Sequence, residues 1–303
     1  MKLHFYLFAL IAVALAACGK VGFSPVDIAT REVRDDLGQT VKVPAKIDRA
    51  ISLAPNLTEM IFAVGAGDKL VGVTSYCNYP PEAKELEKIG DTQTPNIEKI
   101  IALKPQIVFV STASQLESFS KTLDEQGIAV YVTNPSNLDA VLKNLTQLGE
   151  LFGTVDSASR KVKELSERLR EINGHVELDK HFRMEIGESA PRVFMQISNE
   201  PLFTIGRDSF LTELIHQAGG ESVTKDVPTA YPKLSKETAA ALDPDVIILS
   251  DSEDNREPSG VLKGSKAVKN GRVYRINADI ISRPGPRLVD ALEEISAKLG
   301  EKK

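Results

Sequence analysis

The sequence of 303 residues contains no tryptophan, only two cysteines and only four histidines. So few cysteines exclude the disulfide framework of a small secreted scaffold, and the histidines form no metal-ligand motif of the H-E-x-x-H type. A G-x-S-x-G nucleophile elbow and a Walker-type phosphate loop are also missing. We therefore expect a binding protein with no catalytic residues, no bound metal and no cofactor, rather than an enzyme.

Basic residues are also fewer than acidic residues. Lysine and arginine number 37 against 42 aspartate and glutamate residues, which gives a net charge of -5 at pH 7. A nucleic-acid-binding protein needs a basic footprint, so we expect no nucleic-acid partner. The hydrophobic share of 42% and the charged share of 26% are ordinary for a soluble protein and argue against disorder or several membrane spans.

The first residues, "MKLHFYLFALIAVALAACGK", combine the cationic Lys2 with an apolar run over 5–17. This run is too short to span a bilayer comfortably and is typical of a secretory signal peptide. Its end, "LAAC", resembles a bacterial lipobox, so we expect residues 1–18 to be a signal peptide and Cys18 to carry a lipid that anchors the secreted protein to a membrane. Cys77 then has no disulfide partner and is expected to be a partly buried free thiol.

A repeat dominates the rest of the chain. "IEKIIALKPQIVFVS" (97–111) and "KETAAALDPDVIILS" (236–250) align without a gap and pair Glu98 with Glu237. Each copy predicts a short helix that ends before a proline, followed by a β-branched run suited to a buried strand. Two copies are too few for a solenoid, and they indicate a pair of similar lobes.

Between the copies the pattern becomes helical, and it predicts one long amphipathic helix that begins near Thr154 and stops near Gly174. We therefore expect an α/β fold in which two lobes with parallel sheets are joined by one long, stiff helix, with a ligand cleft between the lobes and little lobe motion. The expected divisions are a tether and hairpin at 19–48, an N-terminal lobe at 49–135, a helical connector at 136–189 and a C-terminal lobe at 190–303.

Three segments carry a family resemblance: "RAISLAPNLTEMIFAVGAGDKLVGVTSYCNYPPEA", "IGDTQTPNIEKIIALKPQIVFV" and "RVFMQISNEPLFTIGRDSFLTELIHQAGGESV". From about Arg49 to the C-terminus, the chain resembles the substrate-binding proteins of bacterial ABC importers for cobalamin and iron complexes. The resemblance implies two Rossmann-like lobes joined by one long rigid helix, with the ligand in the cleft between them. It also implies a monomer in the periplasm or on the outer face of the cell envelope. It would deliver its ligand to a permease dimer driven by ATPase subunits.

The resemblance also gives the repeat a function. In this family a glutamate at the outer tip of each lobe docks into an arginine-lined pocket of a permease subunit, and the matching residues here are Glu98 and Glu237. Charge pairs across such an interface favour encounter and register. The alternative is that both glutamates only favour a helix N-terminus, where negative charge suits the dipole.

The cobalamin binders of the family surround their ligand with aromatic side chains. The matching positions here hold Thr92, Ser111 and Ile197, while Tyr76 matches directly and Tyr231 replaces a tryptophan. The candidate ligand-binding residues are Tyr76, Tyr231 and Arg283, with Asn199, Phe203 and Arg207 as weaker candidates.

The ligand itself stays open at this point. The resemblance favours a corrinoid, but Arg207 and Arg283 could equally bind the carboxylates of a ferric siderophore or of haem, because guanidinium binds carboxylates bidentately. A binder of free zinc or manganese is disfavoured because the few histidines form no cluster, and a secreted esterase or chelatase would need a nucleophile or base that the sequence does not display.

Overall fold

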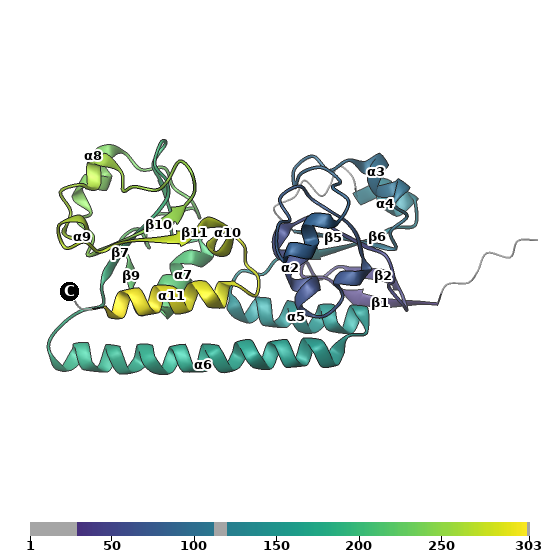
Figure 1. Ribbon diagram of the computed structural model, residues 1–303, viewed down its shortest axis with the longest axis horizontal. Coiled ribbons are helices and arrows are strands. Elements are labelled where there is room, and N and C mark those ends of the chain that lie inside the picture. Colours follow the sequence, from purple (N-terminus) through teal and green to yellow (C-terminus); the bar gives the residue numbers. More distant parts are fainter. Residues whose placement is uncertain (1–28, 112–119, 302–303) are drawn as a thin grey trace, which may run out of the picture.

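The computed structural model describes residues 29–111 and 120–301 and shows an α/β fold of two lobes side by side. A long helix, α6 (Val155–Glu185), runs beneath both lobes along the long axis of the molecule (Figure 1). The predicted two-lobed α/β fold with a long connecting helix is confirmed. The predicted lipidation site, Cys18, lies outside the described residues.

The N-terminal lobe contains a parallel sheet with the strand order β4-β3-β5-β6. Its strands are β3 (Ala50–Ser52), β4 (Leu70–Val73), β5 (Ile107–Ser111) and β6 (Ala129–Thr133). Its helices are α2 (Pro55–Ala63), α3 (Ile97–Ala102) and α4 (Ser120–Glu125), with 3₁₀ turns at Gly67–Lys69 and Pro81–Glu85. The expected hairpin is present as β1 (Thr30–Arg34) and β2 (Thr40–Pro44), which pair antiparallel.

The C-terminal lobe is built around a sheet in which β11, β10 and β7 are parallel. Strand β9 also pairs parallel with β7, but β8 is antiparallel to β7, which departs from the expected all-parallel sheet. The strands are β7 (Arg192–Ser198), β8 (Phe203–Thr204), β9 (Glu221–Ser222), β10 (Val246–Asp251) and β11 (Val273–Asn277). The helices are α7 (Phe210–Gln217), α8 (Lys236–Ala241), α9 (Lys266–Lys269), α10 (Ala278–Ile281) and α11 (Leu288–Gly300), with a 3₁₀ turn at Gly260–Leu262.

Helix α5 (Leu138–Phe152) leads into α6 through Gly153, which has a left-handed φ of 71°. The predicted end of α6 at Gly174 is wrong, because the helix continues to Glu185. A glycine inside a helix costs about 1 kcal/mol relative to alanine, and the packing of Ile172 and Val176 on either side of it against the core outweighs this cost.

One buried apolar cluster connects the two lobes. It includes Leu57 of the N-terminal lobe, Leu165 and Ile172 of α6, Leu292 of α11 and Val193 of the C-terminal lobe. Because these side chains share one core, the lobes are joined by packing as well as by the chain.

The sequence repeat is also a repeat of structure. The first copy forms α3 and β5, and the second copy forms α8 and β10. Strands β5 and β10 are each an interior strand of their sheet. In both copies the residue before the proline has positive φ, 49° at Lys104 and 41° at Asp243. Arg49 donates to the carbonyl oxygens at the end of α3, including that of Lys104, and Arg192 donates in the same way to that of Asp243. The similarity therefore extends beyond the aligned segments to the capping arginines.

Candidate ligand-binding site

A cavity of about 650 Å³ lies between the two lobes. Parallel strands of each lobe end near it, as expected for a ligand site of an α/β protein. Its walls are aromatic rings, amides, hydroxyls, prolines and one arginine–aspartate pair. The lining residues are Ala54, Pro55, Asn56, Tyr76, Thr92, Ser111, Asn134, Pro135, Phe210, Ala230, Tyr231, Asp279, Ser282, Arg283 and Pro284.

The two candidate tyrosines line this cavity from opposite lobes. Tyr76 follows β4 of the N-terminal lobe and is 59% exposed, and Tyr231 precedes α8 of the C-terminal lobe and is 44% exposed. Burial raises the pKa of Tyr231, and the nearby Ser209 hydroxyl acts in the opposite direction, so the phenol is neutral at physiological pH.

Each tyrosine is held by its own lobe. Next to Tyr76, the free thiol of Cys77 is fully buried rather than partly exposed, with Sγ 3.1 Å from the Thr58 hydroxyl oxygen. The Tyr231 loop is fixed to Gly206, whose backbone N–H donates to Ala230 at 2.9 Å. The loop and Gly206 are so close that an added Cβ at Gly206 would lie 2.3 Å from the Thr229 carbonyl oxygen.

Arg283 also lines the cavity, but most of its hydrogen-bonding capacity is used by the protein. Its guanidinium donates to the Asn78 side chain at 2.7 Å, to Asp279 at 2.6 Å, to Glu59 at 3.4 Å and to the Tyr76 carbonyl oxygen at 3.4 Å. Only 11% of its side chain is exposed. Arg283 therefore connects the lobes and has little capacity left for a ligand.

Sequence reasoning missed the two residues that complete this connection. Glu59 on α2 is 3% exposed, and its carboxylate also accepts from Arg287 of the other lobe, at 2.9 Å from Nε. Burial acts to lower the pKa of Arg287, but Glu59 raises it and the net shift is upward. A lone glutamate inside the apolar run "LTEMIF", and two arginines flanking Pro-Gly-Pro in "RPGPR", are the sequence signals that could have found the pair.

The three weaker candidates lie outside the cavity lining. Asn199 is in the turn between β7 and β8, and Phe203 is half-buried in β8. Arg207 is exposed and pairs with Asp208 at 3.5 Å. Phe210 and the amides of Asn56 and Asn134 line the cavity instead.

Of the three positions that match aromatic residues of the cobalamin binders, two line the cavity and one does not. Thr92 and Ser111 line the cavity. Ile197 packs against the apolar core. Two of these three positions therefore face the ligand space with hydroxyl groups in place of rings.

The repeated glutamates lie on the surface, away from the cavity. Glu98 and Glu237 are both exposed, and each is the second residue of its helix. The side chains of Asn96 and Ser235 cap these helices. Helices α3 and α8 lie on the same edge of the molecule, opposite α6 (Figure 1). Hydrogen bonds from its own backbone N–H and from Ser235 lower the pKa of Glu237.

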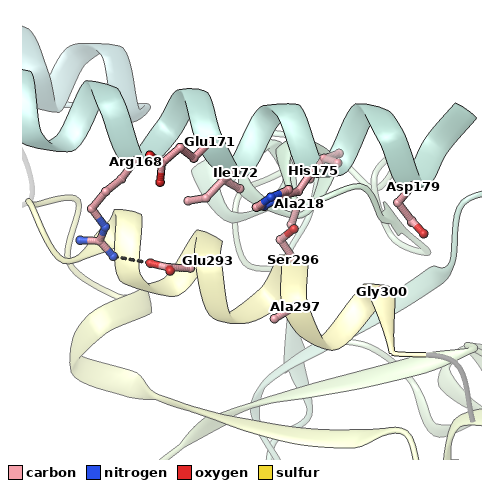
Figure 2. Close-up of a pocket in the computed structure, with 11 residues that line it drawn as sticks. Arg168, Glu171, Ile172, His175, Asp179, Ala218, Glu293, Ser296, Ala297 and Gly300 are labelled. Carbon is pink, nitrogen blue, oxygen red and sulfur yellow. Dashed lines mark hydrogen bonds and ion pairs between the residues drawn. The ribbon is translucent and has the colours of Figure 1, made fainter.

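A second hollow, of about 390 Å³, lies along α6 and α11 (Figure 2). Arg168 of α6 reaches Glu293 of α11 there, and His175 is exposed farther along the groove. Among residues 29–111 and 120–301, no group of three or more His, Cys, Asp or Glu side chains is arranged to hold a metal ion. This groove lies on the helical side of the molecule, away from the interlobe cavity.

Two α/β lobes, a connecting helix and an interlobe cavity define a two-lobed binding protein. The chain belongs to the periplasmic binding protein family, whose model matches residues 51–280. It is 31% identical to an uncharacterized ABC transporter substrate-binding lipoprotein, YvrC, of Bacillus subtilis (strain 168), over 96% of this chain and 94% of that protein.

Two solved structures show the same architecture. The periplasmic vitamin B12 binding protein BtuF of Vibrio cholerae has a TM-score of 0.72 and 30% identity, covering 86% of this chain and 100% of that one. A periplasmic heme binding protein from Pseudomonas aeruginosa has a TM-score of 0.73 and 25% identity, covering 83% of this chain and 92% of that one.

This family consists of transport substrate-binding proteins rather than enzymes. The chain is therefore a substrate-binding protein of the ABC importer type, which acts in the periplasm or outside the cell with a permease, an ATPase and a small-molecule ligand. Within the described residues, no helix is both long and apolar enough to cross a membrane.

Proposed function

We propose that the chain captures a corrinoid of the cobalamin type in the interlobe cavity and delivers it to a membrane permease. The observation that supports this most strongly is the chemistry of the cavity wall. One tyrosine ring comes from each lobe, and the arginine at the wall is already neutralised by Asp279 and Glu59. A flat macrocycle stacked between Tyr76 and Tyr231 would place its rim amides near Asn56 and Asn134.

The charge of the wall also favours a corrinoid over a carboxylate ligand. A siderophore or haem with free carboxylates is best held by unpaired guanidinium groups. Arg283 is engaged with protein acceptors, and Arg207 does not line the cavity. Corrinoid side-chain amides need hydrogen-bond partners without net charge, which the amides and hydroxyls of this wall provide.

One feature supports haem as the second candidate. A tyrosine phenolate is an established axial ligand of haem iron, and two tyrosines line the cavity. In this alternative the hydroxyl group of Tyr76 or Tyr231 is essential. In the corrinoid function the rings matter and the hydroxyl groups contribute little.

Substitution by phenylalanine separates the two candidates, because it keeps the ring and removes the oxygen. The purified protein and its Tyr76→Phe, Tyr231→Phe and double variants are titrated with cyanocobalamin, cobinamide, haemin and ferric siderophores, followed by calorimetry and visible absorbance. The corrinoid function predicts saturable corrinoid binding whose Kd changes by no more than about fivefold in each single variant, since a net hydrogen bond contributes about 1 kcal/mol. Haem binding that loses its tyrosinate spectrum in one variant would establish the alternative.

The same proposed role gives Glu98 and Glu237 a function as the two permease-docking residues. They are exposed, they occupy equivalent positions of the two repeats, and their helices lie on one edge of the molecule. A permease made of two similar subunits would meet the same carboxylate on each lobe, and such pairs set encounter rate and register.

Charge reversal tests the docking role. Glu98→Arg with Glu237→Arg should abolish ligand uptake in cells while leaving the ligand Kd of the purified protein unchanged. Glu167→Arg with Glu177→Arg, on α6, makes the same change in net charge at exposed positions on the opposite edge and should leave uptake intact. Equal loss of uptake in both pairs would point to net charge rather than docking.

The lipid anchor at Cys18 belongs to the same role, since a tethered binder stays near its permease. Mass spectrometry of the mature N-terminus should detect a diacylglyceryl modification at Cys18. Cys18→Ser should release the protein from the membrane fraction.

A further inference from the structure

The N-terminal lobe presents a short segment, residues 76–79, directly to the C-terminal lobe. Arg283 donates to the Tyr76 carbonyl oxygen at 3.4 Å and to the Asn78 amide oxygen at 2.7 Å. The Asn78 amide nitrogen in turn donates to Asp279 at 2.7 Å. The Tyr79 ring lies under the Arg287 guanidinium, 4.1 Å from centroid to Cζ. Three of the four residues thus contact the opposite lobe.

A buried carboxylate organises these contacts. Glu59, from α2 of the N-terminal lobe, is 3% exposed and accepts from both Arg283 and Arg287 of the C-terminal lobe. Together with Asp279, the cluster contains two acidic and two basic side chains, so its formal charges sum to zero. Removing Glu59 would leave two largely buried arginines with the partly exposed Asp279 as the remaining carboxylate of the cluster, which is destabilising.

This cluster lies between two hollows. Tyr76, Asp279 and Arg283 face the ligand cavity, while Glu59 and Arg287 also line a rear cavity of about 460 Å³ on the α6 side. The lobes meet here through polar contacts with space on either side. At this level the charged cluster therefore links the two lobes in addition to the apolar core that they share.

We infer that Glu59 is a positioning residue: its carboxylate, through Arg283 and Arg287, fixes the spacing of the lobes and holds the segment 76–79 so that Tyr76 faces the ligand. The link to ligand capture rests on the proposed function. The latch itself, meaning Glu59, Asp279, Arg283 and Arg287, is a property of the ligand-free protein and can be tested without a ligand.

The first measurement is amide hydrogen exchange of the ligand-free protein by mass spectrometry. Glu59→Gln keeps the size of the side chain but removes the charge that the two arginines share. Exchange should accelerate on the order of tenfold or more in peptides covering 75–79 and 282–289, because breaking a buried pair promotes local opening. Peptides from β5 and β10 should exchange as in the wild type.

Matched variants separate positioning from general stability. Glu293→Gln breaks an exposed arginine pair between α6 and α11 (Figure 2) and should leave both segments unchanged. Adding Arg287→Gln to Glu59→Gln restores the charge balance and should recover part of the protection. If Glu59→Gln does not fold, Asp279→Asn, at a half-exposed carboxylate, should give a smaller acceleration confined to the same segments.

The outcomes are distinct. Wild-type exchange in both segments of Glu59→Gln, or acceleration spread evenly over all strands, overturns the latch. If the latch is found, Glu59→Gln should also weaken binding of cyanocobalamin on the order of tenfold. If cyanocobalamin does not bind the wild type either, the proposed ligand fails while the exchange result still stands. If wild-type affinity persists despite local opening, the latch holds the lobes without positioning Tyr76.

Discussion

Tyr76→Ala offers the most direct test of stacking in the cavity, because the expected loss can be worked out from exposure. Tyr76 is 59% exposed in the ligand-free structure, so most of its ring surface is available for a ligand to cover. A tyrosine buries roughly 150–250 Å² in full, so a covering ligand would bury about 100 Å² more here. At about 25 cal/mol per Å² this amounts to about 2.5 kcal/mol.

That energy corresponds to a Kd about 50–100 times higher for Tyr76→Ala. Isothermal titration with cyanocobalamin measures the change directly, and Tyr231→Ala should cost somewhat less because Tyr231 is 44% exposed before the ligand arrives. Leu37→Ala, which removes a large side chain 48% exposed outside the cavity lining, is the control and should leave the Kd unchanged. A change below about threefold in both tyrosine variants would refute the stacking argument, since the uncovered area alone predicts at least tenfold.

Three further predictions concern the framework. Gly174→Ala should raise the free energy of unfolding by about 0.5–1 kcal/mol in denaturant titrations, since no atom lies within 4 Å of the added methyl and alanine favours the helix; a loss of stability would contradict this. Gly206→Ala should raise the Kd for the ligand in calorimetric titrations, because the new Cβ would displace the Thr229 carbonyl and the Tyr231 loop with it; an unchanged Kd would contradict this. Ser235→Ala should raise the pKa of Glu237 in a carboxyl NMR titration. The folded pKa is depressed, so the charge persists to lower pH in the wild type and is lost earlier, as pH falls, in the variant.

The fold was predictable because its signals are local. Apolar β-branched runs, prolines after short helices and one long amphipathic stretch were enough to predict the strands, the repeat and the connecting helix. The error at Gly174 has a physical cause. Glycine ends helices by propensity, but Ile172 and Val176 pack against the core on either side of it, and this tertiary packing overrides a cost of about 1 kcal/mol.

The site was predictable where a residue could be matched to a family position. Tyr76, Tyr231 and Arg283 were placed in the cleft by resemblance, and the structure brings all three to one cavity. Asn199, Phe203 and Arg207 were weaker candidates because they were expected on loops after strands, and that reasoning gives no direction for the side chain. Phe210 from the same part of the chain lines the cavity, whereas Arg207 pairs with Asp208 outside the lining.

Arg283 shows why residue type alone does not define a ligand. From sequence, a cleft arginine kept an anionic ligand open beside a corrinoid, since guanidinium binds carboxylates bidentately. Glu59, which lies 224 positions earlier in the chain, accepts from this arginine, and Asp279 and Asn78 accept from it as well. The side chain that left a siderophore or haem open in the sequence therefore has little capacity left for a ligand carboxylate in the folded protein. The difference comes from long-range partners that no local pattern encodes.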